Sequence, residues 1–73
     1  MIGRTIQGEL TYFSTQQKTV EITDWESESR LYKIGWQTTS PSGYGLQDLI
    51  GKNVEAIEID GVIKRIVLLP PEI

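Results

Sequence analysis

The residues that could do chemistry are few, because the 73-residue chain contains neither histidine nor cysteine. This composition removes the commonest general base, the thiol nucleophile, the serine–histidine pair and the usual ligands of structural zinc. Carboxylates remain, and Glu55, Glu58 and Asp60 lie close together in the sequence. A catalytic carboxylate pair needs an environment that separates the two pKa values, and a strand beside a tight turn offers no obvious cleft. We therefore expect a protein that is not an enzyme and that has no cofactor or bound metal.

A second group of carboxylates, formed by Asp24, Glu26 and Glu28, alternates along the chain. In an extended segment these three side chains would lie on one side. A calcium loop needs more oxygen ligands and a tight glycine turn. A solvated acidic face, or a surface that meets a basic partner, therefore explains the pattern better than a cation site.

Aromatic side chains are the best candidates for binding, because Trp and Tyr contribute strongly to interface energetics. The alternation of apolar residues predicts that Phe13 and Trp25 point away from the core, and Tyr44 lies between two glycines in a loop. We predict these three residues as partner contacts. Trp25 has a second interpretation, in which it folds down and caps an open end of a barrel. The other aromatic residues share a face with aliphatic neighbours and are predicted to be core: Tyr12, Tyr32 and Trp36.

Strands must position these residues, because period-two alternation dominates the chain and no segment has a sustained helical period. Gly8 interrupts the first strand and indicates a bend or a bulge. Asp60-Gly61 is a dipeptide that favours a two-residue type I′ turn, so it predicts a final hairpin. The predicted elements are strands at 2–12, 19–25 and 30–37, a helical turn at 46–50, and strands at 54–59 and 62–69.

This order of elements predicts an all-β fold in one small domain, residues 1–73. Three strands, one helical turn and a two-stranded hairpin follow one another as in a five-stranded oligonucleotide/oligosaccharide-binding (OB) barrel. An SH3-like barrel is the alternative. If the first two strands keep their even-numbered residues on the core side, the loop between them must have an odd length. A five-residue loop would pair Phe13 with Thr19 and Leu10 with Ile22.

The final hairpin has an apolar surplus, since both of its faces carry aliphatic residues. One face holds Ile57, Ile59, Val62, Ile66 and Leu68, whereas the other holds Val54, Ala56, Ile63, Val67 and Leu69. A small barrel buries only one face of its sheet. The second face must be covered by the helical turn, hidden by a bulge that changes the phase, or buried against another chain. For the last case we predict a homodimer or a protein partner that contacts Val54, Ile63, Val67 and Leu69.

The charge balance argues against nucleic acid as a partner. Seven basic and ten acidic residues give a net charge of −3, whereas proteins that neutralise phosphates usually carry an excess of Lys and Arg. The longest aliphatic run, residues 66–69, is far shorter than a membrane span. No signal peptide is visible, and the lack of cysteine fits a reducing compartment. We expect a soluble, cytoplasmic protein without membrane contact.

The sequence therefore predicts a small binding module that acts through protein–protein contacts, as an accessory factor or a small subunit. The alternative is a single-strand nucleic-acid-binding OB-like protein, in which Phe13, Trp25 and Tyr44 would stack on bases. The basic residues that such a protein needs are scattered along the chain. For that reason the protein-binding interpretation comes first.

Overall fold

The computed structural model describes residues 3–70, apart from the side chain of Trp36. The predicted core position of Trp36 therefore lies outside the described part of the chain. The elements follow one another as β1 (Arg4–Ser14), β2 (Thr19–Thr23), β3 (Ser29–Thr39), a 3₁₀ turn η1 (Leu46–Leu49), β4 (Asn53–Ile59) and β5 (Val62–Leu68). Among the described residues, no helix has the length and apolar character needed to cross a membrane.

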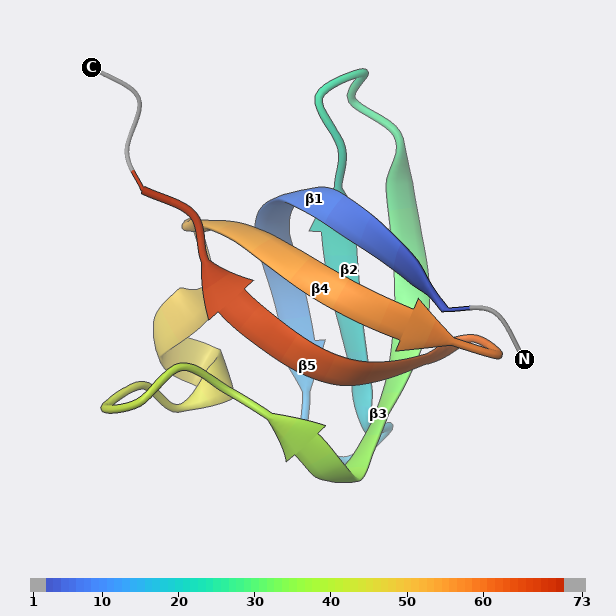
Figure 1. Cartoon of the computed structure of the whole chain (residues 1–73), viewed down its shortest axis with the longest axis vertical. Coiled ribbons are helices and arrows are strands. Elements are labelled where there is room, and N and C mark those ends of the chain that lie inside the picture. The colour runs from blue at the N-terminus through green and yellow to red at the C-terminus, as the bar shows by residue number, and fades with distance from the viewer. Residues whose placement is uncertain (1–2, 71–73) are drawn as a thin grey trace.

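The five strands form a closed barrel in the order β1-β2-β3-β5-β4 (Figure 1). Strand β3 pairs with β5 in parallel, and all other neighbours are antiparallel. This order, with the single 3₁₀ turn between β3 and β4, confirms the predicted OB-like barrel. The predicted turn at Asp60-Gly61 is also confirmed, since both residues have the positive φ angles of a type I′ turn, 54° and 82°.

Strand β1 pairs with a different strand along each part of its length. Its first part, from Arg4 to Glu9, pairs with β4, and the part from Glu9 to Ser14 pairs with β2. Gly8 lies at the change-over, where a Cβ atom would overlap the carbonyl oxygen of Thr23. The predicted bend at Gly8 is therefore a close approach of two backbones, which only glycine permits.

A bulge in β1 changes which side chains face the core. Leu10 pairs with Ile22 and Tyr12 pairs with Glu21, so Thr11 is an extra residue in β1. An extra residue reverses the alternation beyond it. Tyr12 is therefore 48% exposed, and its predicted core position is wrong.

The same bulge turns Phe13 inward. Phe13 is half-buried and packs against the core, so the prediction that it points outward is also wrong. The loop after β1 has four residues instead of five, because Ser14 pairs with Thr19. The bulge supplies the missing residue, and the predicted pairing of Leu10 with Ile22 still holds.

A second bulge explains the apolar surplus of the final hairpin. Glu58 pairs with Ile63 and Ile57 pairs with Arg65, which leaves Lys64 as the extra residue of β5. Because of this shift Ile63 and Ile66 both face inward and are buried, whereas Val67 faces outward. This is one of the internal explanations that the sequence allowed.

The core therefore contains two residues that were predicted as partner contacts. Val54 and Ile63 are both fully buried within the barrel, so they are not available to a partner, and that prediction is wrong for them. Leu49 of η1 is also fully buried, and backbone hydrogen bonds from Gly51 to Leu10 and from Leu10 to Lys52 fasten the turn to β1. The buried apolar set is Leu10, Val20, Ile22, Tyr32, Leu49, Val54, Ala56, Ile63 and Ile66.

Candidate functional site

Exposed apolar side chains lie on the outer surface of β1, β2 and β3. The strand register places Tyr12, Glu21 and Leu31 in one row across the three strands. Leu31 is 63% exposed and Tyr12 is 48% exposed. Neighbouring strands lie about 4.8 Å apart, so the backbones of Tyr12 and Leu31 are separated by roughly 10 Å. We call this surface the strand 1–3 face and define it by Thr11, Tyr12, Glu21, Thr23, Ser29 and Leu31.

A row of hydroxyl groups runs beside this apolar pair. The Thr23 hydroxyl lies 3.2 Å from that of Thr11 and 2.8 Å from that of Ser29. The Thr11 hydroxyl also donates to the Glu21 carboxylate at 2.7 Å. These bonds hold the Glu21 carboxylate in place between the exposed side chains, and they give the strand 1–3 face a fixed polar pattern.

The loop between β2 and β3 presents Trp25 at the end of this face. One Asp24 carboxylate oxygen accepts hydrogen bonds from the backbone N–H groups of Glu26 and Glu28, at 2.9 and 3.0 Å. The backbone of Asp24 bonds to both Ser27 and Glu28, and Ser27 has a φ of 65°. The loop is thus held by its own hydrogen bonds. It leaves Trp25 59% exposed, which favours the predicted contact role over the barrel cap.

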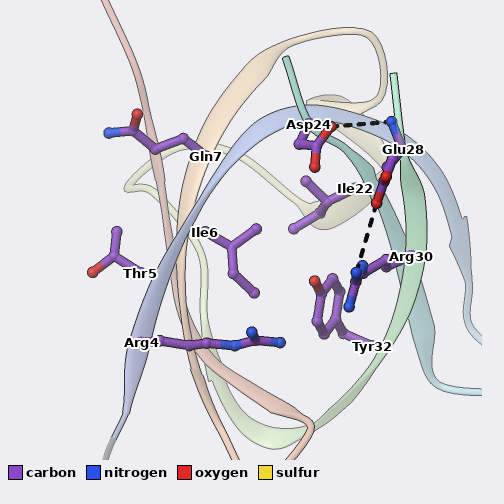
Figure 2. Close-up of a pocket in the computed structure, with 9 residues that line it drawn as sticks. All are labelled: Arg4, Thr5, Ile6, Gln7, Ile22, Asp24, Glu28, Arg30 and Tyr32. Atoms are coloured by element: carbon purple, nitrogen blue, oxygen red, sulfur yellow. Dashed lines mark hydrogen bonds and ion pairs between the residues drawn. The ribbon is translucent and has the colours of Figure 1, made fainter. Parts of the chain in front are cut away.

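A hollow opens at the same end of the barrel, between the first part of β1 and the strands β2 and β3 (Figure 2). Its volume is about 310 Å³. Figure 2 shows Ile6 and Ile22 in its middle, the guanidinium groups of Arg4 and Arg30 on either side of Tyr32, and Asp24 at the opposite end. We call this hollow the barrel mouth; its lining is Arg4, Thr5, Ile6, Gln7, Ile22, Asp24, Glu28, Arg30 and Tyr32.

The Arg4 side chain is fixed by the carboxylate of Glu58. The Nε of Arg4 donates to Glu58 Oε1 at 2.8 Å, and the backbone N–H of Gly61 donates to Glu58 Oε2 at 2.6 Å. Glu58 itself is buried. The hydrogen bonds from Arg4 and then from Gly61 lower the pKa of Glu58. The bond to Glu58 raises the pKa of Arg4, which stays charged.

Arg30 is bound more loosely than Arg4. Its Nη2 lies 3.6 Å from a Glu28 carboxylate oxygen, and both side chains are mostly exposed. That separation is too long for a hydrogen bond. Exposed pairs of this kind contribute about 0–1 kcal/mol, so a ligand would displace Glu28 from Arg30 at little cost.

The seven predicted contact residues do not form one surface. Phe13 lies beside Ile34 and Lys18, whereas Trp25 is in the loop after β2. Tyr44 and Leu69 line a separate hollow near the end of β5, and Val67 is half-buried on the outside of the hairpin. The homodimer remains a prediction, but two of the four residues that suggested its interface are in the core.

Several residues of the candidate sites were not singled out from the sequence, among them Leu31, Arg4 and Arg30. A signal for Arg4 was present, because Arg4 falls on the apolar side of the first strand's alternation, between Ile2 and Ile6. Arg30 similarly precedes Tyr32 and Ile34 at the spacing of one strand face. An arginine on a core-facing position near a strand end indicates a polar barrel mouth.

Comparisons with known proteins identify a fold and no family. No family model matches the chain, and no curated protein matches it. Among solved structures, the crystal structure of Ag(I)CusF is similar, with a TM-score of 0.76 and 12% sequence identity. The match covers 94% of this chain and 100% of that one. At this identity the likeness shows the fold alone.

The name of that structure includes silver(I), but the residues of this chain do not form a set of silver ligands. Silver(I) is a soft cation, and soft metals select thiolate and thioether ligands. The chain has no cysteine or histidine and a single methionine, Met1. In the described residues, no group of three or more His, Cys, Asp or Glu side chains is placed to hold a metal ion.

Proposed function

We propose that the chain is a non-enzymatic binding module that contacts a protein partner through the strand 1–3 face and Trp25. The observation that carries this proposal is the exposure of Leu31, which is 63% accessible in the same row as Tyr12. Tyr12 and Trp25 belong to the residue types that most often anchor protein interfaces, and Leu31 adds exposed apolar area in the same row as Tyr12. The Thr11, Thr23 and Ser29 hydroxyls would surround these anchors with a polar rim.

Nucleic acid is the second candidate, because OB barrels bind oligonucleotides on the face of strands 2 and 3. Tyr12 could stack on a base there. However, Glu21 occupies the middle of the same row, and the net charge of the chain is −3. A carboxylate in this place would repel a phosphate backbone, so the protein partner is the better-supported proposal.

Site-specific photo-crosslinking tests the proposal in cells that express the chain. A benzophenone amino acid at position 31 should give discrete protein adducts, and Trp25→Ala should weaken them. The matched control carries the benzophenone at Arg65, which is exposed on the outside of β5, and should not give the same adducts. Nuclease-sensitive adducts at position 31 would support nucleic acid instead. Equal labelling from both positions would contradict the proposed face.

A titration with a labelled single-stranded oligonucleotide provides an independent measurement. In about 0.15 M salt, where surface charges farther apart than about 8 Å are largely screened, we expect no binding of micromolar strength. Micromolar affinity that falls with added salt would show phosphate neutralisation and would favour the second candidate.

A further inference from the structure

The barrel mouth contains hydrogen-bond donors that the described residues leave unused. Arg4 donates from Nε to Glu58, and its two Nη groups make no hydrogen bond within residues 3–70. With the described side chains, Arg30 makes only its 3.6 Å ion pair with Glu28. The fork-shaped donors of a guanidinium fit a carboxylate or a phosphate in two parallel hydrogen bonds. Two such groups at one opening therefore indicate an oxyanion ligand.

One of the two donors is already held in position. Glu58 is buried and receives hydrogen bonds from both Arg4 and the backbone of Gly61. The Arg4 guanidinium is consequently anchored at Nε while its Nη groups stay available. Figure 2 places this guanidinium below Ile6, facing Tyr32, with Arg30 on the other side of the ring. A ligand that binds there does not have to order the Arg4 side chain, because folding has already ordered it. The entropic cost of binding is therefore smaller.

The carboxylates around the mouth favour an anion with a single charge. Glu58 is paired with Arg4, and Glu28 competes with a ligand for Arg30. One carboxylate oxygen of Asp24 accepts a hydrogen bond from the backbone of its loop. Three carboxylates face two guanidinium groups, so a dianion such as phosphate would meet more repulsion than a monoanion would. Charge therefore selects a carboxylate over a phosphate.

The floor of the mouth favours a ligand with an apolar body. Ile22 is part of the core, and Ile6 packs against that core, yet both line the hollow. The volume of about 310 Å³ is at the small end of the range for ligand pockets, roughly 300–1,000 Å³. It has room for a short aliphatic chain or a single ring.

We propose that the barrel mouth binds a small organic carboxylate. The carboxylate lies between Arg4 and Arg30, and the apolar body packs on Ile6 and Ile22. Binding displaces the Glu28 side chain from Arg30. This site involves residues other than those of the strand 1–3 face, and it stands whether or not that face binds a protein.

A titration followed by NMR tests this site, with sodium hexanoate and sodium benzoate as probes. The signals of Ile6, Ile22 and the arginine side chains should shift and saturate at millimolar or lower concentration. Arg30→Gln should weaken binding about tenfold or more, because a hydrogen bond to a charged group is lost. Glu28→Gln should tighten binding several-fold, because it removes the competing carboxylate. The control Arg65→Gln makes the same charge change on the outside of β5 and should leave the affinity unchanged.

Two further probes distinguish the ligand class. Inorganic phosphate should bind more weakly than hexanoate, and hexylamine should not bind in the mouth. Shifts that fail to saturate by about 10 mM, tenfold above a Kd of about 1 mM, would overturn the proposal. An equal loss in Arg30→Gln and Arg65→Gln would also overturn it, because both would then report general charge screening. Tighter binding of phosphate would show that the apolar carboxylate is the wrong ligand.

Discussion

The outer surface of the β4–β5 hairpin and the strand 1–3 face differ in how far their apolar side chains are exposed. The sequences of the strands do not predict this difference. On the hairpin of β4 and β5, the outward residues are mainly aliphatic, yet Ile57, Ile59, Val62 and Val67 are all half-buried. On the strand 1–3 face most residues are polar, yet Leu31 is 63% exposed. The number of apolar residues in a strand is thus a poor guide to the apolar surface that it exposes.

Neighbouring side chains account for the difference. Across β4 and β5 the register places Ile57 beside Arg65. Long charged side chains cover aliphatic ones in this arrangement. Leu31 instead pairs with Glu21, whose carboxylate is turned toward Thr11 by a hydrogen bond. A single leucine in a row of engaged polar groups therefore stays accessible.

The largest effect is expected next to the β5 bulge, where Ile63 is fully buried in the core. Ile63→Ala should lower the free energy of unfolding by about 2–5 kcal/mol, the cost of truncating a buried aliphatic side chain. Leu31→Ala should change it by less than about 0.5 kcal/mol, as for most surface substitutions. Urea denaturation measures both. Equal, small losses of stability in both variants would show that Ile63 is exposed on the surface of the hairpin.

The stability of the fold should be sensitive to one added methyl group at Gly8, close to the point where the pairing of β1 changes from β4 to β2. Gly8→Ala places a Cβ against the backbone of Thr23, and overpacking of this kind costs roughly 1–3 kcal/mol. Gly35→Ala is the control, because its Cβ would have no atom within 4 Å and its φ is not positive. Thermal unfolding of both variants separates the two cases. A neutral Gly8→Ala would mean that β1 and β2 do not approach so closely.

A smaller effect, which depends on pH, is expected where β4 meets the barrel mouth. The pKa of Glu58 is lowered by hydrogen bonds from Arg4 and Gly61, below the ordinary value of 4.5. The folded state therefore gains stability from Glu58 above the pKa of the unfolded chain, and loses it as the pH falls through the folded pKa. The stability advantage of the wild type over Glu58→Gln should be full at pH 7 and should shrink below about pH 4.5. Denaturation curves between pH 7 and pH 3 measure it, and a constant difference would contradict the pairing.

The smallest effect compares the two outer surfaces directly. Val67→Thr replaces a half-buried methyl group with a hydroxyl and should cost up to about 0.8 kcal/mol, the value of one fully buried CH₂ group. Leu31→Thr should cost less, although it removes more carbon, because Leu31 is already exposed. Chemical denaturation with replicate curves resolves this difference. The reverse order would show that Leu31 is covered and would remove the main support for the strand 1–3 face.

Element order and turn chemistry were predictable from the sequence, and strand phase was not. The turn at Asp60-Gly61 and the bend at Gly8 are local, so one or two residues indicate them. The extra residues of the bulges, Thr11 and Lys64, have no such signature. Each bulge reverses the alternation beyond it, which is why Phe13 was assigned to the wrong side and why Ile63 and Val67 were placed on one face although they lie on opposite faces.

The candidate sites were predictable only in part, for a related reason. The outward position of Trp25 was predicted from the alternation of the strand at 19–25, although β2 ends at Thr23 and Trp25 lies in the loop that follows. The barrel mouth combines Arg4 with Arg30, which lie in different strands and meet only through the pairing of the closed barrel. Long-range proximity of this kind is absent from local patterns. The positions of Arg4 and Arg30 among the apolar residues of their strand faces are the residue-level signals that pointed to it.

The pairing of β1 with β4 also has a consequence for folding kinetics. It joins Arg4 to Glu58, which are 54 residues apart, whereas the β2–β3 and β4–β5 hairpins are local. Contacts between distant residues pay the larger loop-closure entropy, so we expect barrel closure to be the late step. The barrel mouth exists only after that step. Hexanoate bound there should therefore slow unfolding while the refolding rate stays constant, and stopped-flow measurements at saturating ligand would show both rates.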